Sequence, residues 1–235
     1  MKILCIIPAR SGSRGIKDKN IKLLNGKPLL SWSILQAKEC KFDMRIVVST
    51  DSEKYKNIAK EYGAEVPFFR PKEISGDLST DLEFLKHCVD WFKKNENYNP
   101  DFIVQLRPTQ PNRKIEDINN AIELFIKNFD NYDSLRSVIP IKKSCFKMYL
   151  LDENKNKLDP IFNNFNNIKE PYNQCRQVLP TTYLHNGYID ILKTEILNKD
   201  TISGNNILPY IMKYNDNIDI DLPDDWNKSE KTLII

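Results

Sequence analysis

Apolar runs alternate with amphipathic stretches along most of this chain. "KILCIIP", at residues 2–8, is apolar at every position that could face a core, which is typical of a buried parallel strand. Further strands are predicted at residues 44–50, 101–106, 134–141, 187–192 and 207–214. Helices are predicted at residues 27–40, 51–63, 79–95, 114–129 and 224–235.

This alternation of strands and helices predicts the α/β class. We expect three layers, α/β/α, around a mostly parallel Rossmann-like sheet, in one domain over residues 1–235. Open sheets of this kind bind ligands at the carboxyl ends of their strands. The segments that directly follow predicted strands are therefore where we look for a site.

Residues 143–182 interrupt the pattern. The stretch "DENKNKLDPIFNNFNNIKEPYNQ" is polar, rich in Asn and without helical periodicity. We interpret it as an insertion into the single domain rather than as a second core.

Composition limits the possible functions. The 235 residues are 40% hydrophobic and 29% charged, enough for a core, and a net charge of +3 argues against a protein that coats nucleic acid. Five scattered cysteines without C-x-x-C spacing suggest neither a zinc site nor a disulfide framework, and we expect Cys5 and Cys88 to be reduced core thiols. The first apolar run is too short for a signal peptide, and no segment could span a bilayer. These features predict a cytoplasmic protein that binds no membrane.

Positive charge gathers directly after the first strand, in "IPARSGSRGIKDKN" at residues 7–20. Gly12 and Gly15 allow a tight turn and close approach to a ligand, and the exposed N–H groups of such a loop bind anions. Charge-assisted donors come from Arg10, Arg14, Lys17 and Lys19. Neither G-x-x-x-x-G-K-[ST] nor G-x-G-x-x-G occurs here. A triphosphate is the natural ligand, and a solvated basic turn is the alternative.

Two carboxylates stand two positions apart in "IDIDLPDDW". If this segment is a strand, Asp219 and Asp221 share one face while the isoleucines beside them face the core. Close carboxylates repel unless a cation lies between them, and Mg²⁺ is commonly held by one or two carboxylates together with substrate phosphates. The alternative is an edge strand with one solvated face. Asp224 and Asp225 are expected to cap the last helix.

Other charged motifs follow predicted strands. In "RPKEISGDLSTD" and "QLRPTQPNR", Arg70, Arg107 and Arg113 could bind anions, although ordinary ion pairs explain any one of them equally well. His87 and His185 have no nucleophile or metal partner in sequence and are interpreted as structural. No Ser-His-Asp or Cys-His set can be assembled.

Taken together, these motifs resemble the sialic-acid-type cytidylyltransferases, also called CMP-nonulosonate or N-acylneuraminate cytidylyltransferases. The loop "IPARSGSRGIKDKN" resembles the signature loop of that family, and the resemblance covers nearly the whole chain. The other matching motifs occur in the family's order: "STDS", "RPKEISGD", "LRPTQPNR", "RQVLP", "NGYIDI" and "IDIDLPDD". The resemblance implies that an acidic nine-carbon sugar attacks the α-phosphate of CTP, giving a CMP-sugar and pyrophosphate.

The resemblance also implies a role for each matching residue. The catalytic residues would be Lys19, Asp221 and Arg10. The residues that bind CTP would be Arg10, Ser13, Arg14, Gly15, Asn20, Arg70, Ser79, Thr80 and Asp81. The sugar would contact Arg107, Arg176, Gln177 and Asn186. Asp219 and Asp221 would hold Mg²⁺ or Mn²⁺. A homodimer is implied as well, in which residues 143–182 cross to the partner and complete its sugar pocket.

The chain departs from the family pattern at two positions. The sialate enzymes carry "QPTSP" where this chain has "RPTQP", so Arg107 replaces a glutamine expected to touch the sugar. Asp81 stands where a serine would contact the base. The first change suggests a different sugar pocket, which leaves legionaminic and pseudaminic acid open beside N-acetylneuraminic acid.

Two other functions compete with this interpretation. The same fold class hosts the enzyme that couples CTP to 3-deoxy-manno-octulosonate, but the longer loop match and the insertion favour the nonulosonate branch. A non-enzymatic nucleotide-binding module is the alternative from another class. The paired Asp219 and Asp221 argue against it, because binding a nucleotide does not by itself require a dedicated metal pair.

Overall fold

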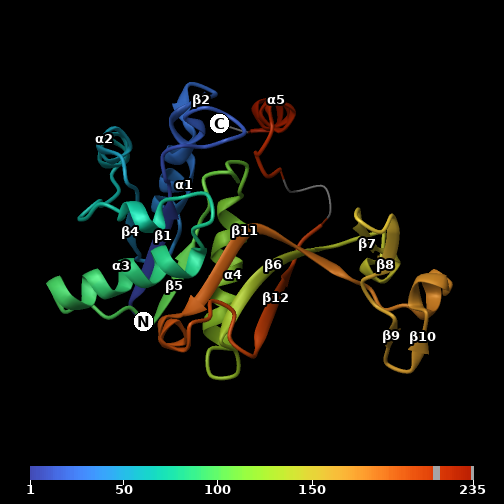
Figure 1. Ribbon diagram of the computed structural model, residues 1–235. Coiled ribbons are helices and arrows are strands. Elements are labelled where there is room, and N and C mark those ends of the chain that lie inside the picture. Colours follow the sequence, from blue (N-terminus) through green and yellow to red (C-terminus); the bar gives the residue numbers. More distant parts are fainter. Residues whose placement is uncertain (214–217, 234–235) are drawn as a thin grey trace. The chain divides into compact units, whose positions relative to one another are not determined.

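The computed structural model of the protein describes residues 1–213 and 218–233 (Figure 1). The chain forms two compact units. The first contains residues 1–137, 186–210 and the described residues from 218 onward, and the second contains residues 138–185 and 211–213. The last residue of the strand predicted at 207–214 and the last two of the helix predicted at 224–235 lie outside the described residues.

A six-stranded sheet forms the centre of the fold, in the order β12-β6-β11-β5-β1-β4. Its strands are β1 (Ile3–Pro8), β4 (Arg45–Ser49), β5 (Phe102–Gln105), β6 (Ser134–Pro140), β11 (Tyr183–Lys193) and β12 (Ile207–Ile211). Strand β1 pairs in parallel with β4 and with β5, whereas β11 pairs antiparallel with β5. The parallel strands β4, β1 and β5 therefore end at one edge of the sheet, as the sequence predicted.

Helices cover both faces of the sheet, which confirms the α/β class and its three layers. The helices are α1 (Leu29–Lys38), α2 (Glu53–Glu61), α3 (Asp81–Glu96), α4 (Ile115–Lys127) and α5 (Pro223–Thr232). Leu4, Ile6 and Ile103 point to one face and join the buried residues of α3 in a single cluster. Phe102 points to the other face, where its ring meets Phe125 of α4 at 5.4 Å.

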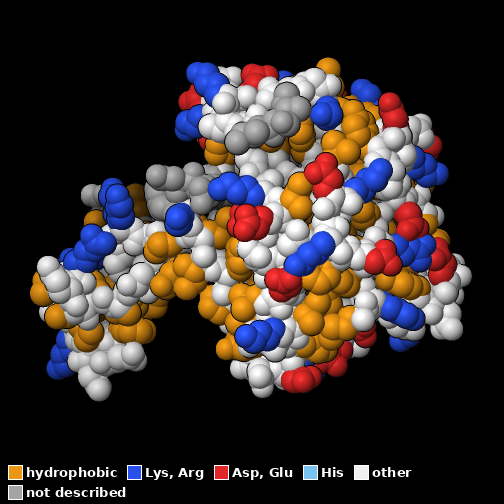
Figure 2. All heavy atoms as spheres, turned by 180° about the vertical axis from the view of Figure 1, so that it is seen from behind, with side chains coloured by type: hydrophobic (Ala, Val, Ile, Leu, Met, Phe, Trp, Pro, Cys, Tyr) orange, Lys and Arg blue, Asp and Glu red, His pale blue; other side chains and the backbone are white. Residues whose placement is uncertain are grey.

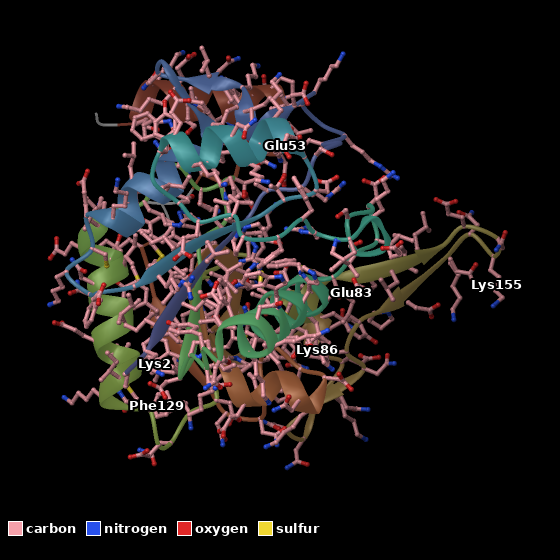
Figure 3. The ribbon with its side chains drawn as sticks, turned by 90° about the vertical axis from the view of Figure 1, so that its left-hand side faces the viewer. Lys2, Glu53, Glu83, Lys86, Phe129 and Lys155 are labelled. Atoms are coloured by element: carbon pink, nitrogen blue, oxygen red, sulfur yellow. The ribbon has the colours of Figure 1, made fainter. Side chains whose placement is uncertain are left out.

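Local sequence signals explain where the helices begin and end. Thr80 precedes α3, and its N–H and hydroxyl both donate to the Glu83 carboxylate, at 2.6 and 3.1 Å. Figure 3 labels Glu83 in the first turn of this helix, with Lys86 one turn later. Gly63 follows α2 with φ +91°, the left-handed conformation that glycine commonly adopts just after the end of a helix.

Short elements connect these layers. The two-stranded pairs are β2 (Leu23–Leu24) with β3 (Lys27–Pro28), β7 (Tyr149–Asp152) with β8 (Lys157–Pro160), and β9 (Asn164–Phe165) with β10 (Ile168–Lys169). The 3₁₀ turns are η1 (Lys19–Ile21), η2 (Lys72–Ile74), η3 (Cys145–Lys147), η4 (Pro171–Asn173), η5 (Arg176–Val178) and η6 (Thr194–Lys199).

The second unit has more regular structure than its sequence indicated. Strands β7 to β10 form two small antiparallel hairpins within it, and Figure 3 labels Lys155 at the turn of the first. Phe146 anchors the unit, because its ring lies 4.9 Å from Phe162 and 4.5 Å from Phe165. Strands of two to four residues are too short to produce a recognisable alternation, which explains why the sequence pattern missed them.

The predicted strand through Asp219 and Asp221 is absent. Residues 218–221 make no strand ladder, and the segment is fixed instead by one backbone bond from Ile220 N–H to Thr109 O, at 2.9 Å. The alternation expected for this segment nevertheless holds. Ile220 is fully buried in a cluster with Leu29 and Trp226, whereas both aspartates are exposed.

Cys5 and Cys88 are buried free thiols, as expected, and burial raises the pKa of each to about 12. Asp225 caps α5, because its carboxylate accepts from the N–H groups of Leu222 at 3.0 Å and Asp221 at 3.3 Å. Within the described residues, no helix has both the length and the apolar character needed to cross a membrane.

The start of β6 yields a prediction about acid stability. The Asp133 carboxylate accepts from the N–H groups of Asn205 and Asn206, at 2.8 and 2.9 Å, and these bonds lower its pKa. A depressed pKa stabilises the folded state above the ordinary carboxyl value of about 3.9 and ceases to do so as the pH falls through the folded-state pKa. We expect Asp133→Asn to unfold more easily than the wild type near pH 7.

The same comparison should be repeated at lower pH by urea unfolding. The gap in free energy of unfolding between Asp133→Asn and the wild type should narrow as the pH falls from about 5 toward 3. A gap that keeps its size over this range would show that the Asp133 charge contributes nothing to the fold.

Candidate functional site

A hollow of about 530 Å³ lies in the first unit, where the segments after β1, β4 and β5 meet. It is lined by Pro8, Arg10, Ser13, Arg14, Gly15, Lys19, Asn20, Arg70, Asp77, Ser79, Asp81, Phe84, Arg107, Pro108, Thr109 and Asp221. Most of the residues singled out from the sequence are among them. We call this hollow the strand-end pocket.

The glycine-rich loop after β1 is anchored at both of its ends. Ser11 donates through its N–H and its hydroxyl to the two oxygens of Asp51, each at 2.7 Å, which ties the loop to the segment after β4. Asn20 is buried and donates from Nδ2 to Arg10 O at 3.1 Å. Gly12 between them has φ +76°, a conformation that side chains disfavour. The loop is thus held in shape without a ligand.

Asp77 pairs with both arginines of this loop. Its Oδ1 lies 2.9 Å from Arg10 Nη2, and its Oδ2 pairs with Arg14 Nη2. These bonds lower the pKa of Asp77, with Arg10 making the largest contribution. Ion pairs this exposed are weak, so a phosphate could replace the carboxylate at modest cost. The two arginines already converge on one anion.

Lys19 joins the loop to the segment that carries the paired aspartates. Its Nζ donates to Ile220 O at 2.7 Å and pairs with Asp221 Oδ1 at 3.0 Å. Gly15 packs so closely here that a Cβ at its position would collide with the carbonyl oxygen of Asp221. Besides the close approach to a ligand expected from the sequence, Gly15 is therefore required for close approach to this backbone.

Asp219 and Asp221 could bind a divalent cation whose other ligands are phosphate oxygens of a substrate. Displacement of water raises the pKa of Asp219, the negative charge of Asp221 raises it further, and a hydrogen bond with Thr109 opposes both. The described residues contain no cluster of three or more His, Cys, Asp or Glu that could hold a metal alone. Oxygen atoms of a substrate would have to complete the coordination, which is how Mg²⁺ is often bound.

Arg70 also lines the pocket and is 4% exposed. Its side chain donates to Ser49 Oγ at 3.0 Å and to Ser49 O at 2.8 Å, so the guanidinium is fixed against the end of β4. It also stacks over the Phe84 ring at 4.6 Å. Burial lowers the pKa of Arg70. The bonds to Ser49 make Arg70 a rigid part of the wall.

Arg107 and Asp81, the two departures from the family pattern, contact each other. Arg107 Nη2 pairs with Asp81, while Arg107 Nη1 pairs with Asp190 of β11. Asp190 is fully buried and also pairs with Arg136 Nη1 at 3.0 Å. Burial lowers the pKa of Arg107, but the two aspartates outweigh burial and the net shift is upward.

Other residues proposed from sequence lie outside the pocket lining. Thr80 is the cap of α3, and Asp219 stands beside the lining rather than in it. Asn186 is buried, where its Oδ1 accepts from Ser137 Oγ at 2.7 Å. Arg176 and Gln177 are exposed residues of η5 in the second unit.

Arg113 has an ordinary structural role, one of the two roles that its sequence context left open. It is buried, donates to the carbonyl oxygens of Tyr188 and Arg107, and bonds Ser33 Oγ at 3.0 Å. Burial lowers its pKa to about 10. Arg113 joins three chain segments and is not available to a ligand.

Sequence reasoning overlooked the acidic partners of the basic residues. Asp51, Asp77 and Asp190 received no role, although each holds a serine or arginine of the site. Asp51 and Asp77 occur in the quoted motifs "STDS" and "RPKEISGD", so their positions after predicted strands were a usable signal. Nothing in the pattern of β11 distinguishes Asp190 from a solvated strand residue.

A second hollow of about 510 Å³ lies beside Trp32, Pro111 and Ile115 in the same unit. Its basic residues include Arg113, whose donors are already used, and Lys27, whose Nζ lies 4.7 Å from the centre of the Trp32 ring. It brings together none of the phosphate-binding or carboxylate motifs. The strand-end pocket is therefore the candidate site.

Comparison with known proteins gives a family match. Residues 4–194 match the model of a family described as "Cytidylyltransferase". The chain is 32% identical over 235 residues to the CMP-N,N'-diacetyllegionaminic acid synthase of Legionella pneumophila, covering 99% of this chain and 97% of that protein. It is 31% identical to the post-translational flagellin modification protein B of Campylobacter coli, covering 94% of this chain and 90% of that protein.

Other relatives are longer, and the structural neighbours are more distant. The chain is 32% identical to the N-acylneuraminate cytidylyltransferase of Escherichia coli, but it spans about half of that protein's length (49%). A solved CMP:2-keto-3-deoxy-manno-octonic acid synthetase, complexed with CTP, has a TM-score of 0.69 at 15% identity and covers 98% of both chains. At that identity the likeness concerns the fold.

The contact of Gly15 with Asp221 gives a prediction. Gly15→Ala should lower stability by roughly 1–3 kcal/mol, because the added methyl group must push the Asp221 backbone away. It should also weaken nucleotide binding, since the paired aspartates move with that backbone. Gly76→Ala is the matched control, because its Cβ would meet only Ser79 Oγ, at 3.8 Å.

Thermal unfolding and calorimetric titration with CTP and Mg²⁺ measure the two effects. Equal melting temperatures and CTP affinities for the Gly15 and Gly76 variants would contradict this account of the loop.

Proposed function

This chain belongs to the cytidylyltransferase family, and we propose that it couples a nonulosonic, sialic-acid-like sugar acid to CTP, releasing pyrophosphate. One observation carries the proposal: Arg10 and Arg14, which both pair with Asp77, line the same pocket as Lys19 and the Asp221 carboxylate with which Lys19 pairs. A polyphosphate with a divalent cation is the ligand that satisfies both kinds of charge.

The proposed reaction is a nucleotidyl transfer. The anomeric hydroxyl oxygen of the sugar forms a bond to the α-phosphorus of CTP, the bond to the β-phosphate oxygen breaks, and the hydroxyl proton is lost. Arg10 and Arg14 hold the triphosphate in place of Asp77, with Ser13 and the Gly15 backbone beside them. Lys19 neutralises charge that develops on the α-phosphate during transfer. Asn20 keeps the loop in the shape that this binding requires.

A divalent cation, Mg²⁺ or Mn²⁺, is part of the proposal. Asp219 and Asp221 would hold it together with phosphate oxygens of CTP. Displacement of water and, to a lesser degree, the charge of Asp221 raise the pKa of Asp219, and a cation would relieve the repulsion between the two carboxylates. Bound there, the metal would neutralise phosphate charge and polarise the attacking hydroxyl. Lys19, which already contacts Asp221, would fix the orientation of that carboxylate.

The second unit is proposed to make the dimer and complete the sugar site of the partner chain. Figure 2 shows hydrophobic side chains on its surface. The exposed ones are Met148, Tyr149, Leu150, Leu151, Leu158, Ile161, Val178, Tyr183 and Leu184. Leu150 and Leu151 are neighbours in β7, so their side chains point to opposite faces of the hairpin. Both side chains are exposed, which means that apolar surface meets water on both faces. A second copy of the chain would remove this apolar surface from water.

The sugar is proposed to meet Arg176, Gln177 and Asn186, as the resemblance implies. A relative matched along nearly its whole length is named for diacetyllegionaminic acid, which supports a bacterial nonulosonic acid as substrate. Another, 32% identical over 160 residues, is named a pseudaminic acid cytidylyltransferase. A cytoplasmic location goes with this proposal, since the reaction consumes CTP.

The defining experiment measures pyrophosphate release from CTP, Mg²⁺ and a panel of sugar acids. We expect release with at least one nonulosonic acid and none after chelation of the metal. Release only with 3-deoxy-manno-octulosonate would assign the chain to that reaction instead. CTP binding without release for any acid would favour a non-enzymatic nucleotide-binding module.

Asp221→Asn tests the proposed metal site. Loss of one carboxylate should lower kcat by about a hundredfold or more, because the cation then lacks half of its protein ligands. Asp224→Asn is the matched control, an exposed carboxylate of the next turn that lies outside the pocket lining. Similar kcat values for both variants and the wild type would contradict the metal assignment.

A mixing experiment tests the shared site. Asp221→Asn damages the pocket of its own chain, whereas Arg176→Ala should damage the sugar site of the partner. At low sugar concentration each variant alone should be nearly inactive, and exchange of subunits in a mixture should restore activity by creating one intact site per mixed dimer. No recovery, with subunit exchange verified by mass measurement, would mean that Arg176 does not serve a partner's site.

A further inference from the structure

Tyr55 of α2 is a buried residue that contacts the loop after β1. Its side chain is 1% exposed, and its hydroxyl donates to Asp18 Oδ1 at 3.3 Å. Asp18 is an exposed residue of the loop. Neither residue belongs to the lining of the strand-end pocket, so their bond can affect a ligand there only through the loop itself.

The start of α2 holds the same loop at a second point. Asp51 precedes the helix and accepts from both the N–H and the hydroxyl of Ser11, each at 2.7 Å. Figure 3 labels Glu53, the first residue of α2, and Tyr55 lies in the same first turn. One helix end therefore contacts the loop at Ser11 and again at Asp18. The loop residues between these two contacts include those proposed to hold the triphosphate.

The backbone of Asp18 is left-handed, with φ +50° and ψ +35°. This conformation is unfavourable for residues that have a side chain, although aspartate and asparagine tolerate it better than most. It turns the chain into η1, where the Asp18 carbonyl oxygen accepts from the N–H groups of Ile21 at 3.0 Å and Lys22 at 3.1 Å. Tyr55 thus fixes the side chain of Asp18, while η1 fixes its backbone.

Lys19 is the residue whose position depends on this turn. It follows Asp18 directly, begins η1, and has a side chain that is 12% exposed. Its Nζ reaches Ile220 O at 2.7 Å and Asp221 Oδ1 at 3.0 Å. A change in the backbone at Asp18 would move the ammonium away from both oxygens. The place of Lys19 therefore depends on a conformation that the Tyr55 hydroxyl stabilises.

The Tyr55 hydroxyl suits this role because it keeps its proton. Burial raises the pKa of Tyr55, and the negative charges of Asp18 and Asp51 raise it further, so the hydroxyl donates throughout the neutral range. Loss of the hydroxyl should affect the whole fold little. The ring would stay buried, and water could solvate the exposed Asp18 carboxylate instead.

We infer that Tyr55 and Asp18 are positioning residues, which hold the loop after β1 in its binding conformation and thereby place Lys19 before a nucleotide arrives. The inference rests on the proposed function and deepens it, because it names two residues outside the pocket lining that act on the same site. A loop that adopts its binding conformation only part of the time binds with an affinity reduced by that fraction. Loss of the bond should therefore weaken binding and slow transfer rather than unfold the protein.

Tyr55→Phe removes the hydroxyl and keeps the ring. In calorimetric titration with Mg²⁺, we expect CTP to bind roughly three- to tenfold more weakly, as the loss of one hydrogen bond implies. In the pyrophosphate assay kcat should also fall, because Lys19 acts in the transfer step, whereas the KM for the sugar acid should not change. Tyr98→Phe is the matched control, since the Tyr98 hydroxyl also donates at 3.3 Å, but to Ile3 O at the other end of β1. This control should bind CTP like the wild type.

Two variants of Asp18 separate its hydrogen bond from its charge. Asp18→Asn keeps an oxygen that can accept from Tyr55 and tolerates the left-handed conformation, so it should bind CTP like the wild type. Asp18→Gly also permits that conformation but removes the acceptor, and it should weaken CTP binding as much as Tyr55→Phe does. Combining Asp18→Gly with Tyr55→Phe should cause no further loss, since both changes remove the same contact.

Hydrogen exchange tests the loop without any substrate. The N–H groups of Lys19, Ile21 and Lys22 are bonded to carbonyl oxygens within the turn, so their exchange rates report its opening. These amides should exchange several-fold faster in Tyr55→Phe and Asp18→Gly than in the wild type and in the two variants that keep the bond.

The outcomes distinguish this inference from the proposed function. Wild-type CTP affinity in Tyr55→Phe would overturn the inference, and so would an equal loss of affinity in Tyr55→Phe and Tyr98→Phe. If Asp18→Asn weakened CTP binding as strongly as Asp18→Gly, Asp18 would act through its charge and the inference would be wrong. Failure of the proposed function would show instead as no pyrophosphate release with any acid. CTP titration and hydrogen exchange need no sugar, so they decide the role of Tyr55 in that case too.

Discussion

The close contact between Gly15 and the Asp221 backbone is the constraint on which the candidate site depends. It brings the loop after the first strand against the segment that contains Asp221, although Lys19 and Asp221 are 202 positions apart in the chain. The Lys19 ammonium stabilises this contact, because it donates to Ile220 O and pairs with the Asp221 carboxylate. Burial of Ile220 holds the same segment from its other side. A cationic loop and a carboxylate pair are thereby placed at one strand-end edge, where phosphate and metal can be bound together.

Charge compensation is the second principle of this pocket. Four of the basic residues that line it pair with a carboxylate of the protein: Arg10 and Arg14 with Asp77, Lys19 with Asp221, and Arg107 with Asp81. The pairs differ in strength with burial. The exposed Asp77 pairs can be exchanged for phosphate at low cost, whereas the pairs around fully buried Asp190 are costly to break. The exposed arginines, Arg10 and Arg14, can therefore bind a substrate, whereas Arg107 and Arg136, which pair with buried Asp190, maintain the structure around the pocket.

Much of the fold followed from local patterns. The apolar strands, the amphipathic helices, the capping box at Thr80 and the left-handed Gly63 are all encoded by near neighbours, and the structure contains each of them. Residues 218–221 alternate between buried and exposed without forming a strand, because alternation arises in any extended segment that packs one side on a core, whether or not it pairs with another strand. The short hairpins of the second unit were missed because two to four residues carry too little pattern.

The sequence by itself determined the order of the elements, the family resemblance and the residue types that face a phosphate, because these depend on spacing within short segments. Only the tertiary structure decided which charges pair. Arg107 and Asp81 are the two positions at which the sequence departs from the family pattern, and they lie 26 residues apart in the chain. Folding brings them together, so that Arg107 pairs with both Asp81 and Asp190. Electrostatic pairing depends on distance and burial, and neither is fixed until segments far apart in the chain are packed together.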